Sequence, residues 1–165
     1  MIASKLIEWT GENAIERKFT AERYAVLSDA SVNQLISEAL SEKSGSVLTS
    51  PKVITSQGQS AWVGIFSEGE SQESGTVFFV EPTSITRDGA ELQYSFQMLN
   101  RPEEGQPSES RLARTVRLEG AARLNIGHWL VQELEKDALS DSRKALLIQI
   151  ERVEIPHEHA TMLGG

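Results

Sequence analysis

The chain has 165 residues, with 24 acidic and 16 basic side chains and no cysteine. This length suits one domain that buries roughly 70% of its unfolded surface. The net charge of −8 disfavours nonspecific binding to nucleic acid or anionic membrane, and the lack of cysteine excludes disulfides and zinc–thiolate sites. No apolar run approaches the about 18 residues of a transmembrane helix, and the N-terminus does not resemble a secretory signal. We expect a single domain over 1–165, cytoplasmic as written.

The first part of the chain contains the clearest helix signal. A short apolar-periodic segment covers 3–9, and alternating side chains predict a strand over 17–27. Ser28 or Asp29 can cap a helix over about 29–43, and Gly45 can end it. The apolar face of this helix consists of Val32, Leu35, Ile36, Ala39 and Leu40.

The remainder predicts mostly strands and polar connections. Further strands are expected at about 46–55, 60–66, 76–81, 90–99, 113–118, 123–131 and 144–155. We expect a mobile acidic loop at 100–110 and a flexible tail at 157–165, while 132–142 is either a short helix or a polar connection. The predicted fold class is α+β and mostly β, with one antiparallel β-rich domain.

The segment 47–61 predicts a hairpin with a kinked start. Pro51 has no backbone N–H, so Ser50-Pro51 must lie at an edge, bulge or crossing. Gly58 is the residue best able to take a positive φ in the turn that follows. A strand then resumes at Ala61 and Trp62.

This hairpin, with the helix before it, resembles the start of the C-terminal domain of secretins, the ring-forming outer-membrane channels of type II and III secretion and type IV pilus systems. Later segments at 75–82, 87–96, 115–120 and 124–127 are similar to successive strand motifs of that family, in the same order. The resemblance covers about 19–156. The structural motif residues that it assigns are Pro51, Gly58, Gly75, Pro82, Asp88, Gly89, Gly120 and Gly127.

The resemblance implies an assembly scaffold without the channel parts. The family's gate segment is replaced by the short acidic stretch 66–74, and its membrane-associated run is replaced by the polar stretch 128–144. We therefore expect a shortened relative in which membrane insertion and a pore are not retained. If the chain is a fragment of a larger secretin-like protein, the cell envelope becomes the expected location.

Candidate catalytic and metal-binding residues are few. His157 and His159 share one side of an extended segment, but a metal site needs a third ligand, and a polar tail is the favoured interpretation. The clustered carboxylates suggest a weak calcium site or paired carboxylates for glycoside chemistry, although a solvated loop is the favoured interpretation; they are Glu68, Glu70, Glu73, Glu103 and Glu104. The terminal Gly164-Gly165 resembles the tail of ubiquitin-like modifiers, although a truncation point is favoured. We expect no enzyme, catalytic residue, metal or cofactor.

Two functions follow from these observations. The first is a non-catalytic domain that oligomerises or binds another protein through its sheet edges, because edge pairing uses main-chain hydrogen bonds and needs no special side chain. The second is an acidic binding or regulatory module whose stretches 68–74 and 100–110 contact a basic partner, with affinity that falls as salt rises. The expected partner is protein, either a second copy or another chain, and not nucleic acid.

Overall fold

The computed structural model describes residues 1–10, 23–41, 45–66, 75–100, 114–134 and 142–152. One helix, α1, spans Asp29–Ser41. The strands are β1 (Ile2–Thr10), β2 (Tyr24–Ser28), β3 (Gly45–Thr49), β4 (Lys52–Val53), β5 (Ala61–Phe66), β6 (Gly75–Ile85), β7 (Gly89–Asn100), β8 (Arg114–Asn125), β9 (His128–Glu133) and β10 (Ser142–Ile150). The predicted class, mostly β with one helix and antiparallel strands, is confirmed.

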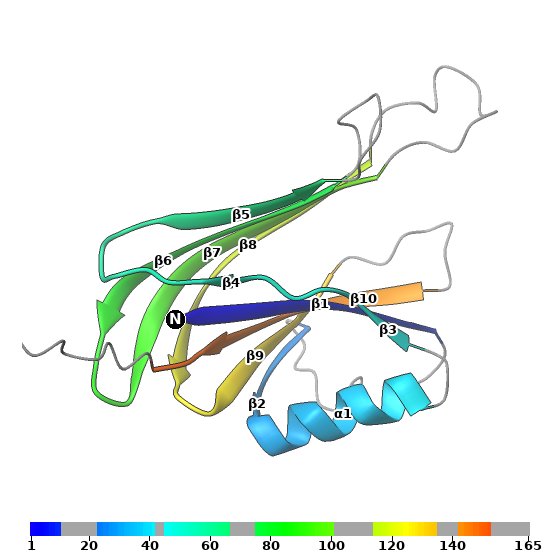
Figure 1. Ribbon diagram of the computed structural model, residues 1–165, viewed down its shortest axis with the longest axis horizontal. Coiled ribbons are helices and arrows are strands. Elements are labelled where there is room, and N and C mark those ends of the chain that lie inside the picture. The colour runs from blue at the N-terminus through cyan, green and yellow to red at the C-terminus, as the bar shows by residue number, and fades with distance from the viewer. Residues whose placement is uncertain (11–22, 42–44, 67–74, 101–113, 135–141, 153–165) are drawn as a thin grey trace, which may run out of the picture.

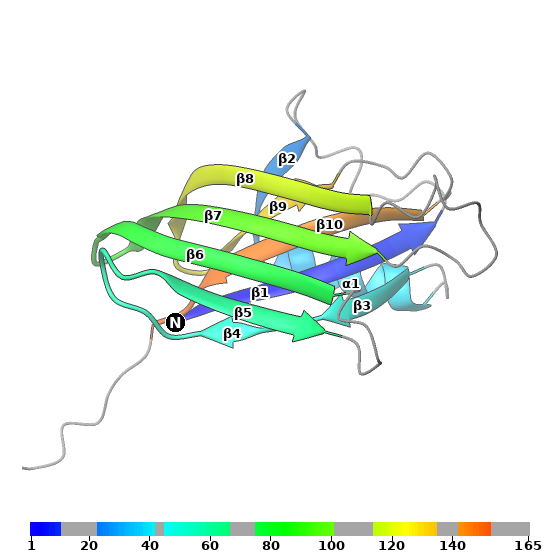
Figure 2. The ribbon, with the colours of Figure 1, turned by 90° about the horizontal axis from the view of Figure 1, so that it is seen from above.

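The strands form two antiparallel sheets, and the helix adds a third layer (Figure 1). The first sheet has the order β2-β9-β10-β1-β3, with β4 also paired to β1. The second sheet has the order β5-β6-β7-β8 and lies across the first, while α1 covers the opposite face of the first sheet (Figures 1 and 2). The sheets lie close together where β8 turns into β9, and they diverge toward the other end of the molecule (Figure 1).

The main core lies between the two sheets. Leu92, Tyr94, Phe96 and Met98 alternate along β7, and all four side chains are buried in this core. Their period of two residues matches the pleat of a strand that buries one face. The side chains that meet them from the first sheet are those of Ile2, Leu6, Leu130, Leu146 and Ile148.

A second apolar cluster joins the first sheet to α1. Val32 and Leu35 of the helix pack with Trp9, Trp129 and other side chains of β1, β9 and β10. Strand β1 is therefore buried on both faces, which explains why its apolar residues occur in adjacent pairs, Ile2-Ala3 and Leu6-Ile7, instead of in a clean alternation.

The start of α1 is fixed by local and distant hydrogen bonds. The Ser28 hydroxyl accepts a hydrogen bond from the Ser31 backbone N–H at 3.3 Å, in agreement with the predicted cap. The Asp29 carboxylate accepts hydrogen bonds from Trp129 Nε1 at 2.8 Å and from Gln149 Nε2 at 3.2 Å. These bonds attach the first turn of the helix to β9 and β10.

Several predicted element boundaries are wrong. The strand expected over 46–55 is divided into β3 and β4, and the last strand ends at Ile150 instead of at 155. We expected separate strands over 113–118 and 123–131, but β8 runs through Gly120 to Asn125, and the turn lies at Ile126 and Gly127. Gly127 has a φ of 81°, which glycine adopts without strain. We expected the strand that begins at 76 to end at 81, but β6 continues to Ile85. Gln132, which we placed in a short helix or a polar connection, belongs to β9.

A buried carboxylate connects β2 with β9. Glu133 is 6% exposed and receives hydrogen bonds from Arg23 at 2.6 and 3.0 Å. Arg23 has a φ of 61°, an uncommon conformation for a residue other than glycine. Its carbonyl in turn accepts a hydrogen bond from the Glu133 backbone N–H at 3.0 Å. The bidentate pair and this backbone bond together hold Arg23 in its unusual conformation.

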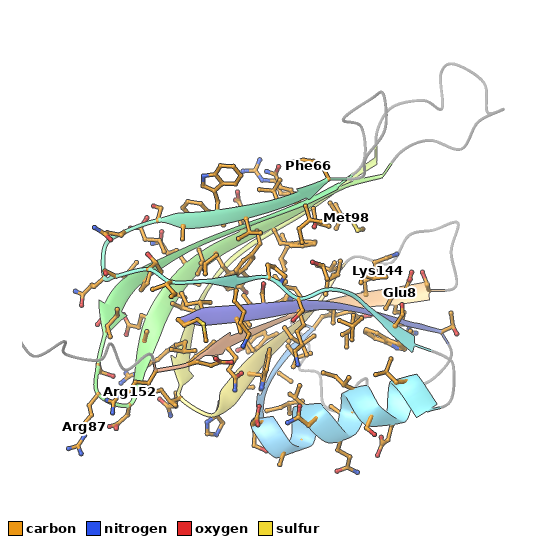
Figure 3. All side chains as sticks on the ribbon, viewed as in Figure 1. Glu8, Phe66, Arg87, Met98, Lys144 and Arg152 are labelled. Atoms are coloured by element: carbon orange, nitrogen blue, oxygen red, sulfur yellow. The ribbon has the colours of Figure 1, made fainter. Side chains whose placement is uncertain are left out.

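An ion pair lies between the sheets at their diverging end, where Figure 3 shows Glu8 and Lys144 side by side. Their side chains, on paired residues of β1 and β10, approach to 3.0 Å. Burial alone raises the pKa of Glu8, but the hydrogen bonds from Ser142 and Lys144 and the charge of Lys144 outweigh it, so the pKa lies below the ordinary glutamate value. The resulting stabilisation is present above the unfolded-state pKa and is lost as the pH falls through the folded-state pKa.

We therefore predict that Lys144→Met raises the pKa of Glu8 to the ordinary glutamate value or above, because burial then dominates. A carbon-detected NMR titration of the Glu8 carboxyl measures this change. Lys52→Met is the matched control, since Lys52 pairs with Glu151 instead, at 3.4 Å. A Glu8 pKa that stays depressed in Lys144→Met would show that Lys144 is not what stabilises the charged carboxylate.

Candidate protein interface at the free edge of strand β5

The motif residues Gly58 and Pro82 lie together. Gly58 has a φ of 72°, and its backbone N–H donates a hydrogen bond to the Pro82 carbonyl at 2.7 Å. Pro82 lies in β6 just past Val80, which pairs with Ala61, the first residue of β5. Because β6 extends beyond β5 at this point, the missing N–H of proline costs the sheet no ladder bond on that side.

Asp88, Gly89 and Gly127 lie in two neighbouring turns. The Asp88 carbonyl accepts a hydrogen bond from the Ile126 N–H at 2.8 Å, and the Gly127 carbonyl accepts one from the Asp29 N–H at 3.0 Å. A Cβ atom on Gly89 would lie 2.1 Å from the backbone oxygen of Leu124. Gly89 thus allows the start of β7 to approach the end of β8 more closely than any other residue would.

We predict that Gly89→Ala lowers the free energy of unfolding by about 2 kcal/mol, because the methyl group must push backbone atoms apart. Chemical denaturation measures the loss. Gly127→Asn serves as control: its φ is 81°, but no heavy atom lies within 4 Å of the added Cβ, and asparagine tolerates this conformation. Equal losses in the two variants would contradict a steric role specific to Gly89.

The remaining motif residues are dispersed. The Pro51 carbonyl, between β3 and β4, accepts a hydrogen bond from the Ser4 N–H at 2.9 Å. Gly120 faces the Tyr94 ring, and a Cβ there would lie 2.4 Å from the tyrosine oxygen. Gly75 is at the opposite end of the second sheet, beside Phe66. The eight residues therefore serve separate turns and close contacts and do not form one site.

The edges of the two sheets differ in how well they are protected against pairing with another chain. In the first sheet, β2 has five residues, and the opposite edge is divided between β3 and β4 by Pro51. In the second sheet, β8 carries the exposed charges of Arg117, Glu119 and Arg123. Short strands, proline and charged side chains are the usual means by which proteins block edge pairing.

Strand β5, the other edge of the second sheet, is only slightly longer than β2, but it has no proline and no ionisable side chain. Among the described strands, its six residues pair with β6 alone. Valine, isoleucine, tryptophan and phenylalanine are also strong strand formers. Among the strands that the structure describes, β5 is therefore the edge most suited to accept another strand.

Two aromatic side chains project from the outer face of β5. Trp62 pairs with Phe79, and the next residues of β6, Phe78 and Val80, belong to the core, so Trp62 and Phe66 point away from the first sheet. Trp62 is 69% exposed and Phe66 is 49% exposed. Figure 3 shows Phe66 at the end of β5 near the diverging end of the sheets. Such exposed aromatic rings are typical of residues that dominate binding at protein interfaces.

Gly64 separates the two aromatic residues and leaves the backbone uncovered between them. A Cβ on Gly64 would lie 2.6 Å from the Phe66 ring and 3.4 Å from the Trp62 ring, so both rings lean over it. On the inner face, Val63 and the 43% exposed Ile65 extend the apolar surface toward the first sheet. The edge of β5 is thus apolar on both faces.

Within the described residues, no group of three or more histidine or acidic side chains could hold a metal ion. His128 Nδ1 is buried without a hydrogen-bond partner in the described part of the chain. The proposed histidine pair at 157 and 159, the acidic stretches 68–74 and 101–110 and the terminal glycines lie outside the described residues.

No known protein family, curated protein or solved structure matches the chain. The secretin resemblance therefore stays a prediction. No helix among the described residues is long and apolar enough to cross a membrane.

Sequence reasoning did not single out Trp62 and Phe66, which the structure places as exposed side chains on an edge strand. The alternate residues Ala61, Val63 and Ile65 are apolar too, so the pattern does not tell which face of the strand is outside. A usable signal was present: six strand-forming residues without a charge or proline, with a glycine between two aromatic side chains.

Proposed function

We propose that this chain is a non-catalytic assembly domain that forms a homodimer by antiparallel pairing of β5 with β5 of a second copy. The observation that carries the proposal is the unprotected edge of β5, which is apolar on both faces and exposes Trp62 on its outer face. Strand addition at such an edge supplies main-chain hydrogen bonds that are unmade in the single chain.

A two-fold axis at Gly64 gives the register that fits the side chains best. In this register Trp62 of one copy lies opposite Phe66 of the other on the outer face, and Val63 lies opposite Ile65 on the inner face. Aromatic pairs and β-branched pairs are among the favourable cross-strand neighbours. The same surface serves both copies, as a two-fold interface requires. The four-stranded second sheets of the two copies then join into one continuous sheet of eight strands.

The charge distribution is compatible with this pairing. Each copy has a net charge of −8, so two copies repel each other at long range, but β5 contains no ionisable side chain. Added salt screens the repulsion and should strengthen the dimer. The alternative acidic module would show the opposite, a complex with a basic partner that weakens as salt rises. Salt dependence therefore separates the two functions.

A concentration series by sedimentation equilibrium tests the proposal. We expect the mass to rise from one chain of 18.2 kDa toward twice that value, with a dissociation constant on the order of 10 µM, because six-residue edge pairing gives a small interface. A constant monomer mass up to about 1 mM overturns the proposal. A larger ring also overturns the two-fold register, since it requires a head-to-tail contact of β5 with a different surface, as a secretin-type assembly would use.

Trp62→Ser should weaken the dimer about tenfold or more, because the variant removes the aromatic pair on both sides of the two-fold axis. The matched control is Ile54→Ser, since Ile54 is 72% exposed but lies outside β5. Sedimentation of both variants measures the effect. Equal weakening would indicate that general surface hydrophobicity drives association.

A further inference from the structure

A pocket opens at the end of the molecule where the two sheets meet. Its floor is formed by buried apolar residues of both sheets, among them Ile2, Ala90 and Leu92. Ile85, the last residue of β6, and Ile126, in the turn after β8, also line it and are 47% and 40% exposed. A ligand in this pocket would remove apolar surface of both isoleucines from water, which is favourable.

The volume of the pocket sets the size of the ligand. It is about 190 Å³, somewhat more than a cavity of about 150 Å³ that accepts benzene. This is well below the roughly 300 Å³ at which pockets for drug-sized ligands begin. The pocket therefore fits one compact apolar group, such as a single aromatic ring.

The rim of the pocket is cationic, in contrast to the chain as a whole. Arg87 and Arg152 both line it, and Figure 3 shows both at this end of the molecule. Arg152 Nη2 donates a hydrogen bond to the Arg87 carbonyl at 3.2 Å, which ties the end of β10 to the turn between β6 and β7. Because a guanidinium has five N–H donors, this bond leaves further donors for a carboxylate.

The one acidic side chain in the lining has a partner of its own. Glu151 approaches Lys52 Nζ at 3.4 Å on the side of β4. The lining thus contains two arginine side chains against one glutamate that is already paired. An anion at this rim would meet favourable charges in a molecule whose net charge is −8.

We propose that this pocket binds a small monocarboxylate with a compact apolar body about the size of benzoate. The ring occupies the apolar floor, and the carboxylate accepts hydrogen bonds from Arg87 and Arg152. The site is independent of β5 pairing, because none of its lining residues belongs to β5.

Titration of the full chain with benzoate, followed by amide NMR, tests the proposal. We expect saturable shifts at Gly89, Ile126 and Arg152, and binding of benzyl alcohol about tenfold weaker, since it lacks the charge. Shifts that do not saturate by about 50 mM benzoate overturn the proposal. Shifts centred on other residues, or equal binding of benzoate and benzyl alcohol, overturn it as well.

Two variants locate the interaction. Arg152→Gln should weaken benzoate binding about tenfold and leave benzyl alcohol unchanged, whereas Arg123→Gln, on the outer face of β8, should change neither. Ala90→Leu should fill the floor and abolish binding of both ligands. If Ala90→Leu does not fold, the comparison of Arg152→Gln with Arg123→Gln still decides the outcome. Equal benzoate affinity in these two variants contradicts the assigned site.

Discussion

Replacing Ile65 by lysine is expected to abolish self-association and to leave the fold intact. Ile65 is 43% exposed on the inner side of the edge strand, so a lysine there can reach water in the single chain. In the dimer the same ammonium group would lie opposite Val63 of the second copy and would lose part of its hydration. Inward-pointing charges of this kind are a common natural device against edge pairing.

The expected size of the effect is an increase of about 100-fold or more in the dissociation constant. Sedimentation gives the dissociation constant, and circular dichroism checks the fold. The matched control is Ala121→Lys, which places the same charge at an exposed position of β8, the opposite edge of the same sheet. If Ala121→Lys disrupts the dimer and Ile65→Lys does not, the interface lies at β8 and not at β5.

Phe96→Ala is expected to cause the largest loss of stability, about 3–5 kcal/mol. The Phe96 side chain is 2% exposed at the centre of β7, between the two sheets. Its removal loses the transfer free energy of the ring and leaves a cavity. The two sheets cannot close this cavity, because each is held in shape by its own hydrogen bonds. Urea denaturation at fixed protein concentration measures the loss.

An exposed position on the same strand supplies the control for Phe96. Gln93 of β7 is exposed, and Gln93→Ala should change stability by no more than about 0.5 kcal/mol. A loss below about 1 kcal/mol for Phe96→Ala would mean that the two sheets do not pack together at β7. That result would contradict the two-sheet core.

Local signals were sufficient for part of the fold. The helix was predictable because its cap at Ser28 and its apolar positions at Val32 and Leu35 agree. Gly45, which we expected to end the helix, is instead the first residue of β3. The core face of β7 was predictable because Leu92 and Phe96 alternate with polar residues. In both elements one face is buried and the other is polar, so the period is visible in the sequence.

Other features depend on pairing between distant segments. Strand β1 lies between β10 and β3 and is buried on both faces, so its sequence lacks the alternation that indicates a strand. We expected a break between the strands 113–118 and 123–131, but Gly120 lies inside β8 and makes room for the Tyr94 ring of the neighbouring strand. Such a contact is decided by register, which the sequence of one strand does not reveal.

The place of β5 at the edge of its sheet and the residues that line the pocket were beyond local reasoning for the same cause. Exposure of Trp62 follows from its place on the outer face of an edge strand, and strand order is set by the whole sheet. Arg87 and Arg152 are 65 residues apart in the chain and meet through one hydrogen bond. Only the assembled fold brings such residues to one rim.

Amide hydrogen exchange of β5 at low and high protein concentration tests the central claim most directly. Edge pairing between two copies should slow exchange within 61–66 as the dimer forms, because backbone N–H groups that face water in the single chain become hydrogen-bonded. Exchange in β8, the other edge of the same sheet, should not change. If the mass doubles while exchange in β5 stays the same, the two copies associate through another surface and the account of β5 is wrong.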